Sequence, residues 1–541
     1  MNYDYIIVGA GAAGCVLANR LSEDPQTRVL LVEAGGSDDR FLIRMPLGFL
    51  RAFRDPSLTW GYMSEPEPHM DGRQIPVTRG RVLGGSSSIN GMFFMRGHSR
   101  DFDGWRDAGC TGWGFADVLP YFKKLESSWR GAVPYHGAAG PMPIAPIDTA
   151  KLLHEPLMQT ASAAGFWTND DLHGRLEEGF ARGEITVDAR GRRANSARAY
   201  LHPVRHRPNL EVMQGALTTR VLIERGRAAG IEVQRANETR KVFADREVIL
   251  CGGTYNSAQL LMLSGVGAGA ALQSLGIRCL ADLPGVGANL SEHARAGVQF
   301  NTRGPVSFLR ELRADRVAFS LLRWWLFGSG VFATQINSCN AVIRTDANLA
   351  QPDIQLMCNP VRMDAKVWLP LISRRQTHLI TVDAVLLHPV SRGRVSLRSA
   401  DPAAKPRIEF KCLAEPEDLA TLRRGLRAAR HIYATAPQSE LVESELAPGA
   451  AMQSDAELDA YIRATAGVTQ HPVGTCSMAA GAGRVVDSEL RVCGIDGLRV
   501  ADASIMPTVP GGNTYGAVLM IAERAADLIR GKTLPPQMEQ L

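Results

Sequence analysis

The sequence predicts an α/β protein (α+β overall) that combines two kinds of domain. Two observations predict it. A strand, a glycine-rich turn, a helix and a second strand follow one another at the N-terminus, and a later region alternates hydrophobic and polar residues without glycine fingerprints. The first pattern is typical of a Rossmann-like parallel sheet and the second of antiparallel strands. A chain of 541 residues is also too long for one ordinary core, which favours more than one domain.

The N-terminal unit is well ordered along the chain. Residues 5–8 form a short apolar run typical of a buried strand, residues 13–21 have the apolar spacing of a helix, and residues 28–32 form a second buried strand. Glu33 ends that strand, at the place where a carboxylate can bind a ribose diol. The unit therefore predicts a Rossmann-like dinucleotide site.

Three glycines between the first strand and the helix fit the spacing G-x-G-x-x-G/A. Gly9 permits the tight turn, Gly11 lets the backbone approach a pyrophosphate, and Gly14 lets helix and strand pack closely. The free N–H groups at the helix N-terminus favour a phosphate there. The unit does not distinguish a flavin from a nicotinamide nucleotide.

Three further stretches bear on the choice between a flavin and a nicotinamide cofactor. Thr78–Gly97 is a glycine- and serine-rich loop suited to wrap an anion or a ring system, and Val248–Gly267 is a strand, a Gly-Gly-Thr turn and a helix. Leu498–Gly531 is a short strand ending at Asp502, a loop with prolines and glycines, and a long amphipathic helix that follows Asn513.

Together these stretches resemble the glucose–methanol–choline (GMC) oxidoreductases, a family of FAD-dependent alcohol oxidases and dehydrogenases. Gly9–Glu33 matches the family's FAD-binding start, and "GRVLGGSSSIN" (Gly80–Asn90) matches its first signature. Gly253–Gly267 matches the second signature, and "HPVGT" and "GGNT" match the active-site pair. "SEPEPHMDGR" and "LGGSSSINGMFFMRG" are most similar to bacterial choline-dehydrogenase-like members.

The resemblance implies an FAD site, with Glu33 on the adenosine ribose and Val221 on the adenine. Ile89 stands where some members carry a histidine that attaches FAD covalently, so noncovalent FAD is expected. The expected cofactor-binding residues are Gly9, Gly11, Ala12, Ala13, Gly14, Glu33, Ala34, Val82, Gly85, Ser86, Asn90, Gly91, Met92, Val221, Asp502, Ala503, Asn513 and Thr514.

The resemblance also implies that His471 and Asn513 are the catalytic pair. Alcohol oxidation removes a proton from oxygen and a hydride from carbon, and a histidine is suited to take the proton. Asn513 would orient the hydroxyl and sits at an N-cap-like position before the last helix. His293 is expected to be structural.

The expected division is residues 1–296 mainly for FAD binding, residues 297–465 mainly for the substrate, and residues 466–541 returning to the FAD-binding domain with the catalytic pair. The substrate domain is expected to be an antiparallel sheet backed by helices. The stretch expected to face the substrate, Phe332–Arg344, contains no Asp or Glu. Apolar bulk for the pocket could come from Phe93, Phe94, Trp324, Trp325 and Phe332.

The predicted function is therefore the oxidation of a primary alcohol, aliphatic or aromatic, to an aldehyde. Choline dehydrogenase and an FAD-containing hydroxynitrile lyase are the alternatives. A non-catalytic nucleotide-binding scaffold and a nicotinamide dehydrogenase are weaker ones. The electron acceptor is either oxygen or a quinone or cytochrome, and the oligomeric state stays open.

Composition excludes several other partners. Lys+Arg 60 against Asp+Glu 55 gives a net charge of +5 without a block of like charges, so nucleic acid is not expected. The 9 cysteines are scattered without a CxxC pair, so neither disulfides nor a metal site is expected. No signal peptide is visible, which favours a cytoplasmic location. The most apolar stretch, Phe319–Ala333, is interrupted by Arg323 and is shorter than the roughly 20 residues of a bilayer span, so its contact with a membrane surface is only a minor alternative.

Overall fold

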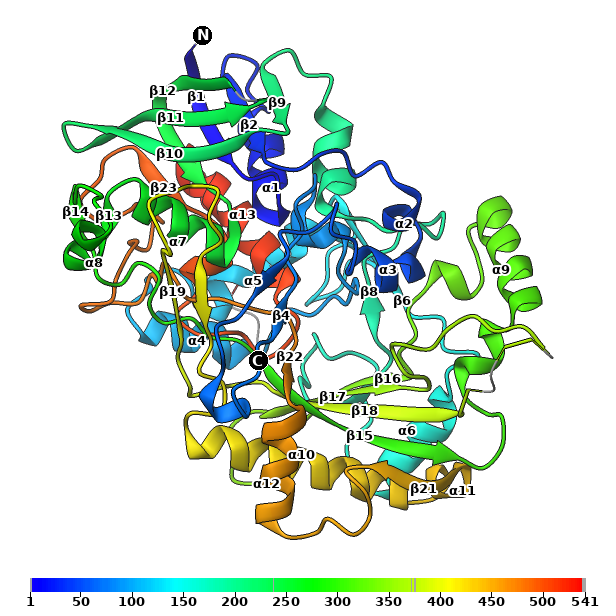
Figure 1. The fold of residues 1–541 in the computed structure, drawn as a ribbon. Helices are drawn as coiled ribbons and strands as arrows, with labels where there is room; N and C mark the ends of the chain where they lie inside the picture. The colour runs from blue at the N-terminus through cyan, green and yellow to red at the C-terminus, as the bar shows by residue number, and fades with distance from the viewer. Residues whose placement is uncertain (1, 237, 371, 374–375, 538–541) are drawn as a thin grey trace.

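The computed structural model describes residues 2–236, 238–370, 372–373 and 376–537 and contains two large sheets (Figure 1). The mixed α/β class expected from the sequence is confirmed. No helix in the described part of the chain is long and apolar enough to cross a membrane.

The first sheet has seven strands and carries the N-terminal unit. Its central strands are parallel, and two antiparallel strands extend one edge. The parallel strands are β1 (Asn2–Val8), β2 (Val29–Glu33), β9 (Leu210–Gln214), β12 (Glu238–Leu250) and β23 (Leu498–Val500), and the antiparallel ones are β10 (Leu217–Glu224) and β11 (Arg227–Arg235). The order is β10-β11-β12-β1-β2-β9, with β23 also paired to β12. Segments from both ends of the chain therefore build one sheet.

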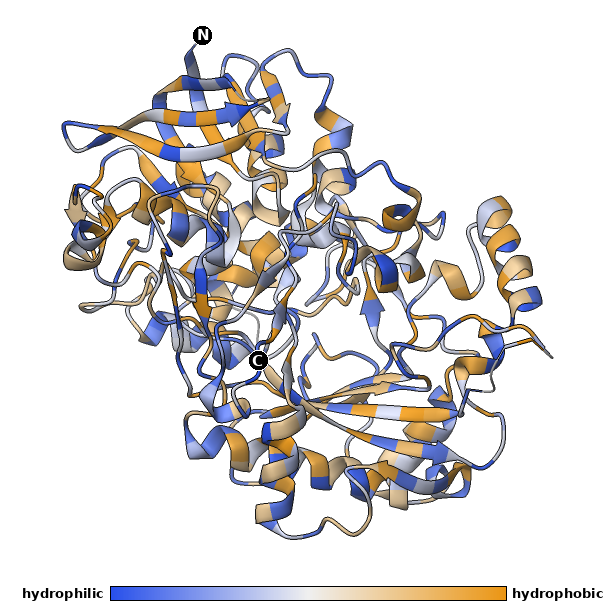
Figure 2. Cartoon of the chain, in the orientation of Figure 1, coloured by the Kyte–Doolittle hydropathy of each residue, from blue (hydrophilic) through white to orange (hydrophobic). Residues whose placement is uncertain are grey.

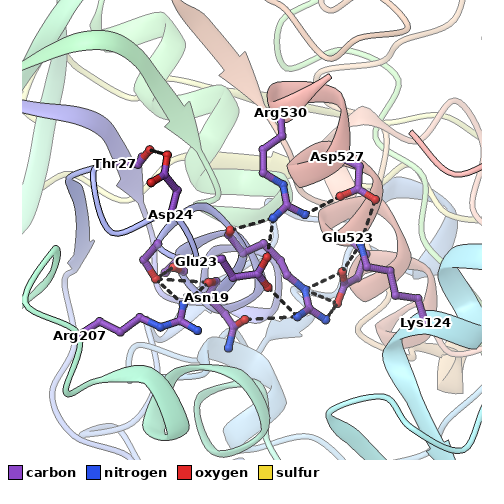
Figure 3. Close-up of polar contacts among 12 residues, drawn as sticks. Asn19, Glu23, Asp24, Thr27, Lys124, Arg207, Glu523, Asp527 and Arg530 are labelled. Carbon is purple, nitrogen blue, oxygen red and sulfur yellow. Dashed lines mark hydrogen bonds and ion pairs between the residues drawn. The ribbon is translucent and has the colours of Figure 1, made fainter. Parts of the chain in front are cut away.

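Four helices from four distant parts of the chain pack beside this sheet or against one another. They are α1 (Ala12–Leu21), α5 (Phe115–Leu125), α7 (Gly253–Leu263) and α13 (Tyr515–Arg530). Arg20 of α1 donates to the fully buried carboxylate of Glu523 on α13 at 2.7 Å, and Lys124 of α5 lies 3.2 Å from the same carboxylate (Figure 3). Removing one partner of such a buried ion pair typically costs about 3–5 kcal/mol, so this cluster holds the last helix against the first.

The second sheet is antiparallel and also has seven strands. The order is β21-β15-β18-β17-β16-β7, with β22 paired to β15. Their bounds are β21 (Val442–Ala447), β15 (Ala294–Thr302), β18 (Leu379–Leu386), β17 (Ile354–Asn359), β16 (Cys339–Ile343), β7 (Gly179–Ala181) and β22 (Gly467–Val468). Figure 1 shows α10 (Pro416–Ala434) and α12 (Asp455–Thr465) below this sheet and the first sheet with its helices above it. The expected helix-backed antiparallel sheet is present, and β7 joins it from the first third of the chain.

Short elements connect the two sheets. The remaining helices are α2 (Phe41–Arg44), α3 (Phe49–Ala52), α4 (Ser99–Asp107), α6 (His154–Ala163), α8 (Gly269–Ser274), α9 (Ala314–Phe327) and α11 (Gln438–Leu441). The remaining strands are β3 (Tyr62–Met63), β4 (Pro76–Val77), β5 (Glu126–Ser128), β6 (Met142–Pro146), β8 (Glu184–Ile185), β13 (Val266–Gly267), β14 (Ala281–Asp282), β19 (Arg394–Ser396) and β20 (Arg407–Glu409).

Candidate active site

A cavity of about 1090 Å³ lies where the N-terminal glycine unit and the second sheet approach each other. Most of the expected site residues line it, although they come from distant parts of the sequence. These are Gly9, Gly11, Ala12, Ala13, Glu33, Ala34, Gly85, Ser86, Asn90, Gly91, Met92, His471, Asp502, Ala503, Asn513 and Thr514.

The glycines of the N-terminal turn have the geometry that a dinucleotide needs. Gly9 has φ +100°, and a Cβ on it would lie 2.5 Å from the carbonyl oxygen of Cys251. A Cβ on Gly14 would lie 1.9 Å from the carbonyl oxygen of Gly9, so helix and strand touch there. A Cβ on Gly11 would have no neighbour nearer than 3.9 Å. The backbone at Gly11 is thus open toward the cavity at the N-terminus of α1, where a pyrophosphate fits.

Glu33 is held at the adenosine end of this cradle. Its two carboxylate oxygens accept hydrogen bonds from the backbone N–H of Ala10 at 2.9 Å and of Gly35 at 2.7 Å. Burial raises the pKa of Glu33 to about 7. The residues present therefore fit a bound dinucleotide with its ribose against Glu33.

Three expected residues are not among the described residues that line the cavity: Gly14, Val82 and Val221. Val221 lies inside β10, where its N–H donates to Ser264 Oγ. Residues 216–218, at the start of the same strand, line the cavity instead. The start of β10 therefore faces the cavity, and the contact of Val221 with the adenine stays a prediction.

The first-signature loop is fastened by a buried arginine that sequence reasoning missed. Arg193 is fully buried and donates to Asn90 Oδ1 at 2.8 Å and to the carbonyl oxygens of Ser87 and Ile43. Asn90 Oδ1 also accepts from the N–H of Met92 at 3.0 Å. No motif marked Arg193, because it lies about a hundred residues from the loop it holds.

The loop before the expected base has a strained backbone at Gln470, which hydrogen bonds hold in place. Gln470 has φ +69°, a conformation that typically costs a non-glycine residue about 1–3 kcal/mol. Its carbonyl accepts from Arg79 Nη2 at 2.6 Å, and its Oε1 accepts from the N–H of Thr78 at 2.9 Å. These bonds offset the strain and fix the direction in which His471 leaves the loop.

The residues after His471 are fixed as well. The carbonyl oxygen of Pro472 accepts from Thr254 Oγ1 at 2.6 Å. Gly474 has φ +97°, and a Cβ there would lie 2.3 Å from the carbonyl oxygen of Asn289. The loop is thus held against Thr254 and Asn289 on the C-terminal side of the imidazole.

A chain of hydrogen bonds defines which nitrogen of His471 is free to accept a proton. His293 Nε2 lies 3.0 Å from the carbonyl oxygen of Leu387, so Nε2 carries the hydrogen and Nδ1 of His293 is an acceptor. His471 Nδ1 lies 3.1 Å from that acceptor and donates to it. The lone pair of a neutral His471 is therefore on Nε2, which lies 3.1 Å from Asn513 Nδ2.

The electrostatics keep this imidazole neutral. Burial, with a smaller contribution from the charge of Arg79, lowers the pKa of His471 to about 3. Burial also lowers the pKa of His293 far below its ordinary value. Glu292 lies behind both rings, where its Oε1 accepts from the N–H of His471 at 2.7 Å and of His293 at 3.0 Å. Burial raises the pKa of Glu292 to about 7.

His293 was expected to be structural, and it is fully buried, but it also touches the expected base. The sequence offers only a faint signal for this role. His293 directly precedes β15, the strand that pairs with β22, and β22 ends shortly before His471. Only the pairing brings the two histidines together.

Asn513 is not the N-cap of the last helix, which contradicts the expectation from the sequence. Thr514 holds that position, and no side chain caps the helix. Asn513 instead directs its amide at His471 Nε2, and its Oδ1 accepts from Gln355 Nε2 at 3.4 Å. The side chain is turned toward the cavity because partners from the second sheet lie there.

The substrate end of the cavity contains few of the aromatic residues considered from the sequence. Of the five, Phe93 lines the cavity, and the other four, each expected in the core rather than at the pocket, are not among the described lining residues. A carboxylate that the sequence did not indicate, Asp383 on β18, does line it. Arg295 on β15, also a lining residue, donates to this carboxylate at 2.7 Å.

Comparison with known proteins identifies the family. The models of the GMC oxidoreductase family match residues 3–295 and 389–522. The chain is a member of the GMC oxidoreductase family. It is therefore an FAD-binding oxidoreductase that acts on CH–OH donors.

Curated relatives include enzymes named oxygen-dependent choline dehydrogenase. That of Rhizobium etli is 41% identical over 98% of this chain and 96% of its own length, and that of Burkholderia multivorans is 42% identical over 98% and 94%. Among solved structures, pyridoxine 4-oxidase from Mesorbium loti has a TM-score of 0.88 at 32% identity, covering 98% of this chain and 99% of its own. Formate oxidase of Aspergillus oryzae has a TM-score of 0.91 at 28% identity, with 98% of each chain covered.

The arrangement predicts that the rate of flavin reduction depends on pH through the ionisation of Glu292 rather than of His471. Glu292, with its pKa of about 7, becomes a carboxylate above that pH and then stabilises an imidazolium at His471. We expect the rate of anaerobic flavin reduction to rise through about pH 7, as rapid mixing with an alcohol substrate would measure. Glu292→Gln should lower the rate and abolish this rise. A rise that persisted in Glu292→Gln would mean that the imidazole itself titrates there.

Proposed function

We propose that the protein oxidises a neutral primary alcohol to its aldehyde, with His471 as the base and Asn513 as the group that orients the hydroxyl. The observation that carries the proposal is the lone pair of His471 Nε2, which accepts a hydrogen bond from Asn513 Nδ2 at 3.1 Å at the cavity wall. A hydroxyl between them donates to the imidazole and accepts from the amide. When bound, FAD supplies the acceptor for the hydride.

The other residues of the cluster support this transfer. His293 holds the hydrogen of His471 on Nδ1, so that the lone pair points at the substrate. Glu292 compensates the positive charge that the proton brings. Gln355 fixes Asn513 with its nitrogen toward the imidazole.

The second candidate, choline oxidation, is supported by the names of the curated relatives. A quaternary ammonium is best bound by an aromatic cage and an uncompensated carboxylate. Asp383 lines the substrate end, but Arg295 neutralises it at 2.7 Å. This ion pair favours an uncharged alcohol over choline.

FAD is proposed to be bound without a covalent link. Ile89 lines the cavity at the place in the first signature where covalent members carry a histidine. The proposed acceptor is oxygen, supported by the oxygen-dependent relatives and the solved oxidases, with a quinone or cytochrome as the alternative. A cytoplasmic location stays a prediction from the sequence.

The role of His471 predicts a large loss of rate with the cofactor in place. Removing a general base typically slows the reaction by a factor of about 10²–10⁴, so His471→Ala should slow anaerobic flavin bleaching by that factor. Acid precipitation of wild type and variant should release equal amounts of yellow FAD into the supernatant. Unchanged bleaching would remove His471 from the role. Chromophore left in the pellet would exclude noncovalent attachment.

Substrate choice is tested by a panel of alcohols. Medium-chain or benzylic alcohols should bleach the flavin of the wild-type enzyme, and choline should bleach it only poorly. Arg295→Ala frees Asp383 and should raise kcat/KM for choline about tenfold, the effect of roughly 1.4 kcal/mol, while neutral alcohols change little. Choline as the best wild-type substrate would overturn the neutral-alcohol proposal. If none of the alcohols tested, choline included, bleached the flavin, the result would instead favour a lyase.

The acceptor is tested after the flavin has been reduced. Mixing the reduced enzyme with oxygen in a stopped-flow instrument should restore the oxidised spectrum at a rate that at least matches turnover. Reoxidation far slower than turnover with a soluble quinone would identify a quinone-type acceptor.

A further inference from the structure

Helix α9 exposes apolar side chains although its inner side is already packed. Ser320 and Trp324 face inward, and Trp324 Nε1 donates to the carbonyl oxygen of Gly191 at 2.7 Å. On the outer side, Phe319 and Trp325 are each 67% exposed and Phe327 is 75% exposed. Surface helices of globular proteins normally place one apolar stripe inward and polar residues outward. The outer apolar stripe of α9 therefore has no partner in the described part of the chain.

A second segment extends this surface. Trp368 is anchored beside the start of α9, since its carbonyl accepts from the N–H of Ala314 at 2.9 Å and its N–H donates to the carbonyl of Leu312 at 3.0 Å. Around it, apolar side chains are again exposed, with Ile372 at 80%. We call the combined set the α9 face: Phe319, Leu322, Trp325, Leu326, Phe327, Val367, Leu369 and Ile372.

The α9 face projects from the body of the molecule. Figure 1 shows α9 at the right-hand edge, away from both sheets, and Figure 2 shows hydrophobic and hydrophilic residues side by side along it. The helix has 14 residues, which at about 1.5 Å per residue is too short to span a bilayer. Its length and its mixed surface suit a helix that lies in a membrane interface.

The charges around the α9 face indicate which kind of partner the face can bind. Residues 310–327 and 362–372 carry six cationic side chains against three carboxylates. The cations are Arg310, Arg313, Arg316, Arg323, Arg362 and Lys366, and the carboxylates are Glu311, Asp315 and Asp364. A symmetric dimer would bring this face against a copy of itself and oppose like charges. An anionic lipid surface complements the same charges.

We propose that the α9 face docks the protein on a membrane surface that contains anionic lipids. The aromatic and aliphatic side chains enter the interface. Arg313, Arg316 and Arg362 pair with the three carboxylates, and the cationic side chains in excess of these pairs bind the phosphate groups. The proposal does not rest on the proposed function, because none of the α9 face residues belongs to the catalytic cluster.

The experiment uses the full chain with its FAD and two matched variants. Trp325→Gln removes one aromatic ring from the α9 face. Trp167→Gln removes an equally exposed ring, at 63%, from a different surface loop. Binding is measured by co-sedimentation with vesicles of phosphatidylcholine alone or mixed with phosphatidylglycerol. The FAD content of each protein reports folding.

Wild type and Trp167→Gln should sediment with the mixed vesicles, more weakly at high salt, and bind phosphatidylcholine alone much less. Trp325→Gln should partition about tenfold more weakly, as expected for losing one buried aromatic ring. Equal binding by Trp325→Gln and wild type, or no binding by wild type, would overturn the proposal. So would a dimer in analytical ultracentrifugation without lipid that Trp325→Gln abolishes, since a second copy would then cover the face.

Discussion

One hydrogen bond, from His471 Nδ1 to His293 Nδ1, connects the chemistry of this enzyme to its architecture. His293 stands immediately before β15, and His471 stands shortly after β22, which pairs with β15 through Ala294 and Val468. The carbonyl of Leu387, just after β18, fixes the far side of the His293 ring. The register of the antiparallel sheet thus sets the tautomer of the base. A shift of one residue would turn His293 to the other face of the sheet and leave that tautomer undefined.

The same burial that orients the base also weakens it. A desolvated imidazole resists protonation, whereas a general base works best with a pKa near the working pH. The proposed answer to this conflict is Glu292, whose carboxylate accepts hydrogen bonds from the backbone N–H groups of both histidines. The site therefore keeps a neutral imidazole before the substrate arrives and compensates the imidazolium afterwards. Removal of water makes both effects stronger, since charges interact more strongly in a low-dielectric site.

Local patterns predicted the parts of the structure that local physics determines. The N-terminal strand, turn and helix form within three residues of the expected positions, because the apolar runs and the steric need for Gly9 and Gly14 are properties of the segment itself. The family resemblance added His471 and Asn513, which no local rule could select. Neither the local patterns nor the family resemblance predicted the contacts of Arg193 and His293. A single buried polar residue has no periodicity that would mark it in the sequence.

The differences from expectation around the cavity arise from tertiary position. Val221 lies inside β10, whereas residues 216–218 at the start of that strand line the cavity, and strand prediction does not say which end of a strand faces a cavity. Asn513 sits one residue before the N-cap, and partners on the opposite sheet decide where its side chain turns. Arg295 and Asp383 are 88 residues apart in sequence, and their ion pair joins two neighbouring strands. Only the pairing of β15 and β18 places the two charges together at the substrate end.

Helix α9 shows why apolar residues on more than one side of a helix leave its buried face undecided at the sequence level. Periodicity cannot choose an inner face when Trp324 and Trp325 are adjacent and both apolar, and here one is buried while the other is exposed. The buried side of α9 belongs to the same hydrophobic cluster as Phe49 and Met92, and those two residues line the cavity. In a protein docked through the α9 face, this cluster would lie between the lipid and that part of the cavity wall.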